Sequence, residues 1–139
     1  MSNLFPVFAV SGSGLDVYKQ WLNAVSDNVA NADDTSSTSG PAFQARYIVA
    51  QDVPGGPDGT GAGVRVAGVA YGSAAGIEVY APDDPHADKQ GMVRKPDIDM
   101  GEQVTAMMIA ERGYEANLAV VNRAENAYQA ALSITPGHG

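Results

Sequence analysis

Both ends of this chain carry an apolar side chain at nearly every seventh position, and that spacing leaves few folds open. In residues 7–32 two such series interleave in steps of three and four, which predicts a helix with one apolar stripe. Gly12 and Gly14 disfavour helix, so a firm start is expected only near Ser13, with an end near Asn31. The series are Phe8, Leu15, Leu22 and Val29, and Ser11, Tyr18, Val25 and Ala32.

Residues 99–133 repeat the pattern. Asp99 can cap the first turn, and Pro136 with Gly137 is expected to end the helix. At about 1.5 Å per residue this helix would be about 50 Å long, and the first about 38 Å. The heptad members are Met100, Met107, Tyr114, Val121 and Tyr128, with Val104, Leu118 and Leu132 in a second series that Glu111 and Glu125 interrupt.

The residues between the two helices show the short alternating runs that are typical of strands. We expect strands at 43–49, 64–69, 77–80 and 92–94, which together form one small, imperfect antiparallel sheet. A helix of about 50 Å is too long to pack wholly on such a sheet, so its stripe must meet the other helix or another subunit. The predicted fold class is α+β: two long terminal helices form a coiled-coil-like layer around a small antiparallel β insert.

Three segments follow from this division. Residues 1–34 are the N-terminal helical assembly segment, 35–98 a small β-rich middle domain with loops, and 99–139 the C-terminal helical assembly segment. The two helical segments are expected to form one layer.

Charge and composition exclude several classes of partner. The 139 residues include 16 Asp and Glu but 8 Lys and Arg, a net charge of −8. This balance argues against nucleic acid and against anionic membrane surfaces, since both bind basic patches. There is no cysteine, which removes disulfides and thiolate chemistry. No apolar run is long enough to insert in a membrane, and the first residues lack the basic region of a signal peptide.

An acidic loop at 81–88 is the best candidate for metal or enzymatic chemistry. Asp83, Asp84, Asp88 and His86 could hold Ca²⁺, but the EF-hand spacing is absent and the flanking prolines favour a plain turn. The glycine-rich stretch 55–63 lacks the ending of a phosphate loop, and two histidines leave no nucleophilic triad. We therefore expect no catalytic residue, no metal and no cofactor, while a Ca²⁺-binding domain stays open as an alternative.

Asparagines in the helical segments carry more information. Asn is a poor helix former, yet Asn28, Asn31, Asn117, Asn122 and Asn126 all lie in or beside predicted helices. Asn31 has a plain explanation as a helix terminator. A buried amide between assembling helices can fix their register, which is the interpretation we favour for Asn117. Asn122 and Asn126 suit a solvated face equally well.

These motifs together resemble the bacterial flagellar axial proteins, which build the rod and the hook. The terminal motifs are shared by several members, whereas the middle series narrows the resemblance to the proximal rod, and the likeness covers residues 4 to about 134. The terminal motifs are 13–15 (SGL), 28–31 (NVAN) and 112–117 (RGYEAN). The middle series is 63–66 (GVRV), 80–88 (YAPDDPHAD), 91–93 (GMV) and 96–99 (PDID).

The resemblance implies a structural subunit of the flagellar basal-body rod, not an enzyme. Such a subunit polymerises with copies of itself and with other rod proteins, transmits motor torque and encloses the export channel. It leaves the cell through the flagellar type III export apparatus without a cleaved signal, spans the periplasm with its neighbours, and neither binds nucleic acid nor inserts in the membrane. An export adaptor or chaperone, which would form a stable dimer, is a further alternative.

For this function we predict an assembly interface on the terminal helices, within or between subunits. Leu22→Asp should prevent incorporation into the rod, and Arg112 could pair with a neighbour's carboxylate. Loops 35–41 and 54–62 are candidates for contacts with adjacent rod proteins. The predicted interface residues are Phe8, Leu15, Tyr18, Leu22, Val25, Asn28, Val29, Asn31, Met107, Arg112, Tyr114, Asn117, Leu118, Val121 and Tyr128.

Overall fold

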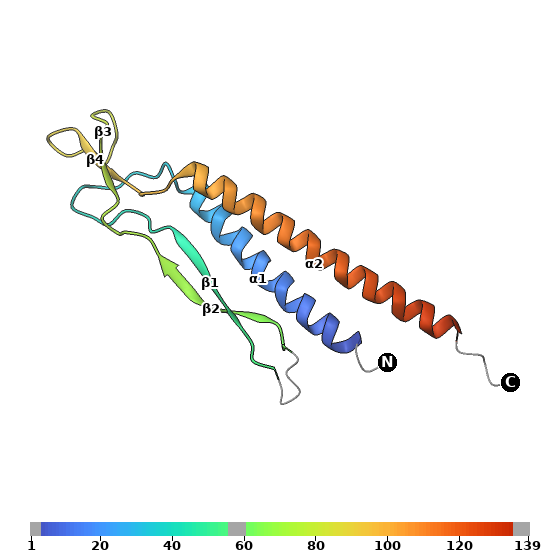
Figure 1. The fold of residues 1–139 in the computed structure, drawn as a ribbon. Coiled ribbons are helices and arrows are strands. Elements are labelled where there is room, and N and C mark those ends of the chain that lie inside the picture. Colours follow the sequence, from blue (N-terminus) through green and yellow to red (C-terminus); the bar gives the residue numbers. More distant parts are fainter. Residues whose placement is uncertain (1–3, 56–60, 135–139) are drawn as a thin grey trace.

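The computed structural model describes residues 4–55 and 61–134, and it confirms the α+β class (Figure 1). Two long helices enclose four short strands in the sequence. In order, the elements are α1 (Leu4–Ala30), β1 (Arg46–Asp52), β2 (Val64–Tyr71), β3 (Ile77–Tyr80), β4 (Met92–Lys95) and α2 (Met100–Ile134). None of the helices described is long and apolar enough to cross a membrane.

The first helix begins earlier than its composition suggests. The expected firm start near Ser13 is wrong, because α1 is helical from Leu4 onward and passes through both glycines. Pro6 stands in the first turn, where a missing N–H is tolerated. Gly14 is buried and packs directly on α2, so close packing compensates for its low helix propensity. The predicted end is confirmed, since α1 stops at Ala30.

The second helix starts as predicted. The Asp99 carboxylate accepts a hydrogen bond of 2.9 Å from the backbone N–H of Glu102, which is an N-cap. From there α2 continues for 35 residues to Ile134. The predicted stop signal at Pro136 and Gly137 lies outside the described residues.

The expectation of a single sheet is wrong. β1 pairs with β2 and β3 pairs with β4, each as a separate two-stranded antiparallel hairpin. The paired strands are joined by loops 53–63 and 81–91, whereas the shorter connection 72–76 links the two hairpins. β1 also begins three residues later than the predicted strand 43–49, and a bulge shifts its register between Val49 and Ala50. A short bridge between Ser36 and Arg94 is the remaining pairing described.

The first helix is the central layer of the molecule. α1 and α2 lie side by side and antiparallel, and the β1–β2 hairpin runs along another side of α1 (Figure 1). The β3–β4 hairpin lies beyond the end where α1 stops and α2 starts (Figure 1). Among the described helices and strands, α2 packs against α1 alone. Within residues 4–55 and 61–134, most of the surface of α2 therefore has no other helix or strand packed on it.

The core is thin and made of small side chains. Apart from Val93, the largest fully buried side chain is polar, that of Asn28. Small residues let the backbones of the helices approach closely but bury little apolar area per residue. The buried apolar residues are Val17, Ala24, Val25, Ala42, Ala45, Val93, Ala110 and Ala124.

Candidate functional site: an assembly surface on the helix hairpin

A fully buried asparagine joins three elements. The Asn28 side-chain amide donates to the Arg46 carbonyl of β1 at 2.9 Å and to the Gln103 side-chain oxygen of α2 at 3.0 Å. Its own oxygen accepts from the Arg46 backbone N–H at 2.8 Å. The Arg46 guanidinium also pairs with the carboxylate of Asp27 on α1. Since a buried amide is costly unless it is paired, these bonds specify how α1, β1 and α2 meet.

Small residues set the register of the two helices. A Cβ atom on Gly14 would lie 2.8 Å from the side-chain oxygen of Asn117, and one on Gly113 would overlap the ring of Tyr18. Tyr18 of α1 lies opposite Gly113 of α2. Ten residues after Tyr18, Asn28 contacts Gln103, which stands ten residues before Gly113. The register of the antiparallel pair is therefore constant along its length.

The helices also hold the β1–β2 hairpin at a second point. The Ser13 hydroxyl donates to the Val10 carbonyl at 2.7 Å and accepts from the backbone N–H of Val64 at 3.1 Å. Beside Val64, Gly63 has φ +104 and comes so close to Ser13 that a Cβ there would overlap the serine oxygen. The hairpin is thus fixed to α1 near both ends, through Ser13 and Asn28, two residues of the terminal motifs.

The predicted interface residues divide into three groups by burial. Val25 and Asn28 are buried within the chain. Asn31 donates to the Asp27 carbonyl at 2.7 Å and ends α1, as predicted. The half-buried group is Phe8, Leu15, Tyr18, Leu22, Val29, Asn31, Met107, Tyr114, Asn117 and Val121. The exposed group is Arg112, Leu118 and Tyr128.

The contact between the helices uses only part of this set. Tyr18, Asn28 and Asn117 lie between α1 and α2 of one chain. Asn117 also donates to the Gly113 carbonyl at 2.9 Å, one turn back on its own helix. Arg112 makes no ion pair within the described residues. Leu118 and Tyr128, also in the predicted set, are exposed on α2.

Sequence reasoning missed Trp21, which lies outside the heptad series. Its ring stacks on Tyr18 with centroids 6.1 Å apart and planes at 15°. One groove beside it, of about 210 Å³, is also lined by Val17, Tyr18, Ile48, Ala50 and Val64. A second, shallower groove on the α2 side of Trp21 is lined by Asp99, Gly101, Glu102, Thr105, Ala106 and Ile109. The spacing of two aromatic residues three apart on a helix was the available signal.

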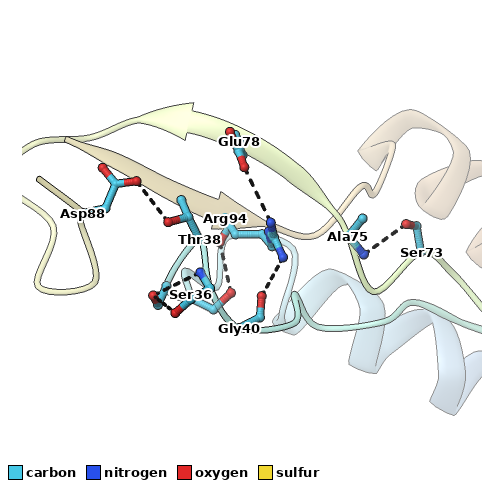
Figure 2. Close-up of polar contacts among 10 residues, drawn as sticks. Ser36, Thr38, Gly40, Ser73, Ala75, Glu78, Asp88 and Arg94 are labelled. Atoms are coloured by element: carbon cyan, nitrogen blue, oxygen red, sulfur yellow. Dashed lines mark hydrogen bonds and ion pairs between the residues drawn. The ribbon is translucent and has the colours of Figure 1, made fainter. Parts of the chain in front are cut away.

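The predicted contact loop 35–41 is held firmly against β4. Ser36 and Arg94 exchange two backbone hydrogen bonds of 2.8 Å. The Arg94 guanidinium donates to the Gly40 carbonyl at 2.7 Å and pairs with the Glu78 carboxylate at 3.5 Å (Figure 2). This loop therefore presents a fixed shape to its surroundings. Of the other predicted contact loop, 54–62, residues 56–60 lie outside the described residues.

The second helix and the residues just before it match a known family. The family model described as flagellar basal body rod FlgEFG protein C-terminal matches residues 89–134. The chain is 34% identical to the flagellar basal-body rod protein FlgC of Escherichia coli O6:H1 over 131 residues. This alignment covers 94% of the chain and 97% of the relative. The chain belongs to the FlgC family of flagellar basal-body rod proteins.

Similar FlgC proteins come from several bacteria. FlgC of Salmonella typhimurium is 33% identical over 94% of this chain and 97% of the relative. FlgC of Borreliella burgdorferi is 33% identical over 96% of this chain and 99% of the relative. The resemblance seen in the motifs is confirmed. This FlgC-family chain is a structural subunit of the flagellar basal-body rod, and it is not an enzyme.

In this FlgC-family chain the acidic loop is built as a turn. Asp84 accepts from the His86 backbone N–H at 2.7 Å, and this bond holds the pKa of Asp84 below its ordinary value. Asp88 accepts from the Met92 backbone N–H at 2.9 Å, which lowers its pKa in the same way, and from the Thr38 hydroxyl at 3.0 Å (Figure 2). Within residues 4–55 and 61–134 no cluster of acidic or histidine side chains suits a metal ion. The Ca²⁺-binding and export-adaptor alternatives are not supported.

Proposed function

We propose that this FlgC-family chain polymerises through its helix hairpin, with copies of itself and with other rod proteins. The assembly forms the proximal part of the drive shaft, which transmits motor torque and surrounds the export channel. The observation that carries this proposal is the unpartnered surface of α2. Its exposed apolar side chains are Met100, Val104, Met108, Ile109, Leu118, Val120, Tyr128, Leu132 and Ile134.

Energetics support a role for neighbours in completing the fold. Burying one Leu, Ile or Met side chain contributes about 1.5 to 3 kcal/mol. The chain by itself buries mostly Ala and Val, so contacts of α2 with a neighbour add stabilisation that the isolated chain lacks. Assembly of the rod therefore further stabilises a helix pair that the isolated chain already forms, so rod assembly and the stability of this pair are coupled.

The proposed assembly face is the side of the helix hairpin away from Trp21. Trp21 of α1 shares a groove with Ala106 and Ile109 of α2, so these three residues lie on one side of the helix pair. The proposed face is the other side of the same pair. One residue turns a helix by about 100°, which places Leu22 and its heptad partners on that opposite flank. The face consists of two rows, Phe8, Leu15, Leu22 and Val29 on α1, and Met107, Tyr114 and Val121 on α2, all half-buried. Exposed Leu118 extends the second row, and Arg112 reaches a neighbour's carboxylate.

The proposal also includes the location and the export route that the resemblance implies. The rod crosses the periplasm, and the chain reaches it through the flagellar type III export apparatus without a cleaved signal. Segments 1–34 and 99–139 form the assembly layer, and the middle domain 35–98 lies outside it. Loops 35–41 and 54–62 contact adjacent rod proteins. The assembly uses no cofactor and no nucleic acid.

Leu22→Asp tests the assembly face. The new carboxylate lies on a half-buried apolar row, so incorporation into basal bodies should be lost while the β3–β4 hairpin stays folded. Asn23→Asp is the matched control, because it adds the same charge at the adjacent, exposed position of α1. The readouts are the amount of the chain in isolated basal bodies and the amide spectrum of the soluble protein. Normal incorporation of Leu22→Asp would refute the proposed face.

A further inference from the structure

The far end of α2 projects beyond the described start of α1. In the constant register, Gly14 lies opposite Asn117 and Asn28 opposite Gln103, so Leu4 lies opposite Ala127. The last seven residues of α2, 128–134, therefore continue past that point by about 10 Å. Figure 1 shows this end of α2 reaching past the start of α1. Exposure of its large apolar side chains rises from 37% at Tyr128 to 51% at Leu132 and 77% at Ile134.

A groove of matching chemistry lies on another side of the same chain. Between α1 and the β1–β2 hairpin, Val17, Trp21, Ile48, Ala50 and Val64 line an opening of about 210 Å³ together with Tyr18. An apolar cavity of about 150 Å³ holds a benzene molecule, so this one has room for an aliphatic side chain of the size of Leu or Ile. Its walls are fixed, since Ser13 and Asn28 fasten the hairpin to α1 on either side of it.

The groove and the projecting helix end cannot meet within one chain. The groove lies at the middle of α1, around Val17 to Trp21. The projecting residues 128–134 lie past the end of the helix pair where α1 starts. The two surfaces are also different from each other, so a contact between them is heterologous. Contacts of that kind repeat from copy to copy and build closed rings or open helical assemblies, so they suit a subunit of a helical rod.

Charge selects this pairing over its competitors. A chain with net charge −8 repels its own copies wherever acidic surfaces meet. The segment 127–134 (AYQAALSI) contains no Asp, Glu, Lys or Arg, and neither does the lining of the 210 Å³ groove. The second groove beside Trp21 includes Asp99 and Glu102 and is less suited to an apolar helix end. Trp is among the residues that contribute most to binding when they are buried at the centre of an interface.

We infer that the end of α2, residues 128–134, of one copy docks in the groove between α1 and the β1–β2 hairpin of a second copy. Leu132 fills the groove, and Trp21 forms its wall. This inference rests on the proposed polymerisation and specifies one of its contacts.

The first test is cross-linking between two single-cysteine variants of the full chain. The chain has no cysteine, so Leu132→Cys and Ala50→Cys each introduce a unique thiol. The two variants are mixed, allowed to assemble and treated with a short bis-maleimide reagent. The expected product is a 50–132 heterodimer. Met108→Cys mixed with Ala50→Cys is the matched control, because Met108 is 50% exposed on α2 and Leu132 is 51% exposed. The control should give no heterodimer.

The second test uses the fluorescence of Trp21, the sole tryptophan of the chain. Its emission maximum should move to shorter wavelength when the protein assembles. Leu132→Asp should abolish this shift, while Asn122→Asp, which adds the same charge at an exposed polar position of α2, should not. Assembly without the 50–132 product and without the Trp21 shift would overturn this inference. A dominant 50–50 or 50–108 product would overturn it too. Either result would leave the proposed polymerisation standing. A wild-type chain that neither self-associates nor enters basal bodies would overturn both.

Discussion

Replacing Asn28 should destabilise the whole chain, because its side chain joins α1, β1 and α2. The residue is fully buried and makes three hydrogen bonds, to Gln103 and to both backbone groups of Arg46. Each neutral hydrogen bond contributes about 1 kcal/mol net, so Asn28→Ala should lower the free energy of unfolding by about 3 kcal/mol. With a urea dependence of about 1 to 3 kcal/mol per molar, the unfolding midpoint should fall by about 1 to 3 M.

The assay is urea unfolding of the purified chain, followed by circular dichroism of the helices. Gln103→Ala removes one of the three bonds and leaves Asn28 paired with Arg46, so it should cost only about 1 kcal/mol. Asn23→Ala is the control, since an exposed position on the same helix should change stability by no more than about 0.5 kcal/mol. An Asn28→Ala variant as stable as this control would refute the role given to the buried amide.

Two further predictions concern glycines and pH. Gly113→Ala should destabilise the chain by about 1 to 3 kcal/mol, because its Cβ overlaps the ring of Tyr18. Gly12→Ala, with open space around the new Cβ, should instead stabilise it by up to about 1 kcal/mol; equal urea midpoints for the two variants would contradict this reasoning. The hydrogen bond from the Met92 N–H lowers the pKa of Asp88 in the folded chain. This bond therefore stabilises the folded state fully at pH values above the unfolded pKa of about 3.9. The stabilisation is lost as the pH falls through the lower pKa of the folded state. The Met92 amide chemical shift should titrate with a midpoint below about 3.9, and Asp88→Asn should abolish this titration; a midpoint at or above 3.9 would show that the bond is not the cause.

The sequence alone predicted the elements better than their contacts. Heptad spacing located both helices, because that period follows directly from helix geometry. It missed Trp21 and placed no emphasis on the burial of Asn28, since α1 contacts two partners and a single stripe describes only one of them.

Helix propensity was also a poor guide at positions where close packing between the helices determines which residue fits. Gly14 was expected to weaken the start of α1, yet it packs closely on Asn117 of α2, just as Gly113 packs closely on Tyr18 of α1. The strands were located to within a few residues, but their pairing was not, because alternation specifies a strand and says nothing about its neighbour. Two separate hairpins and one sheet have the same alternating pattern.

The central position of α1 also limits the order in which this fold can form. The residues that cover α1 come from β1, β2 and α2, so Asn28 has to wait for Gln103, 75 positions later in the chain. A lone helix of 27 residues with two glycines in its first half is a poor structure in water, since most helical stability in proteins comes from tertiary packing. A chain threaded through a narrow passage from either end therefore cannot close its central layer until the last long segment has come out. For the export route proposed above, this means that the layer around α1 closes only after the whole chain has left the channel.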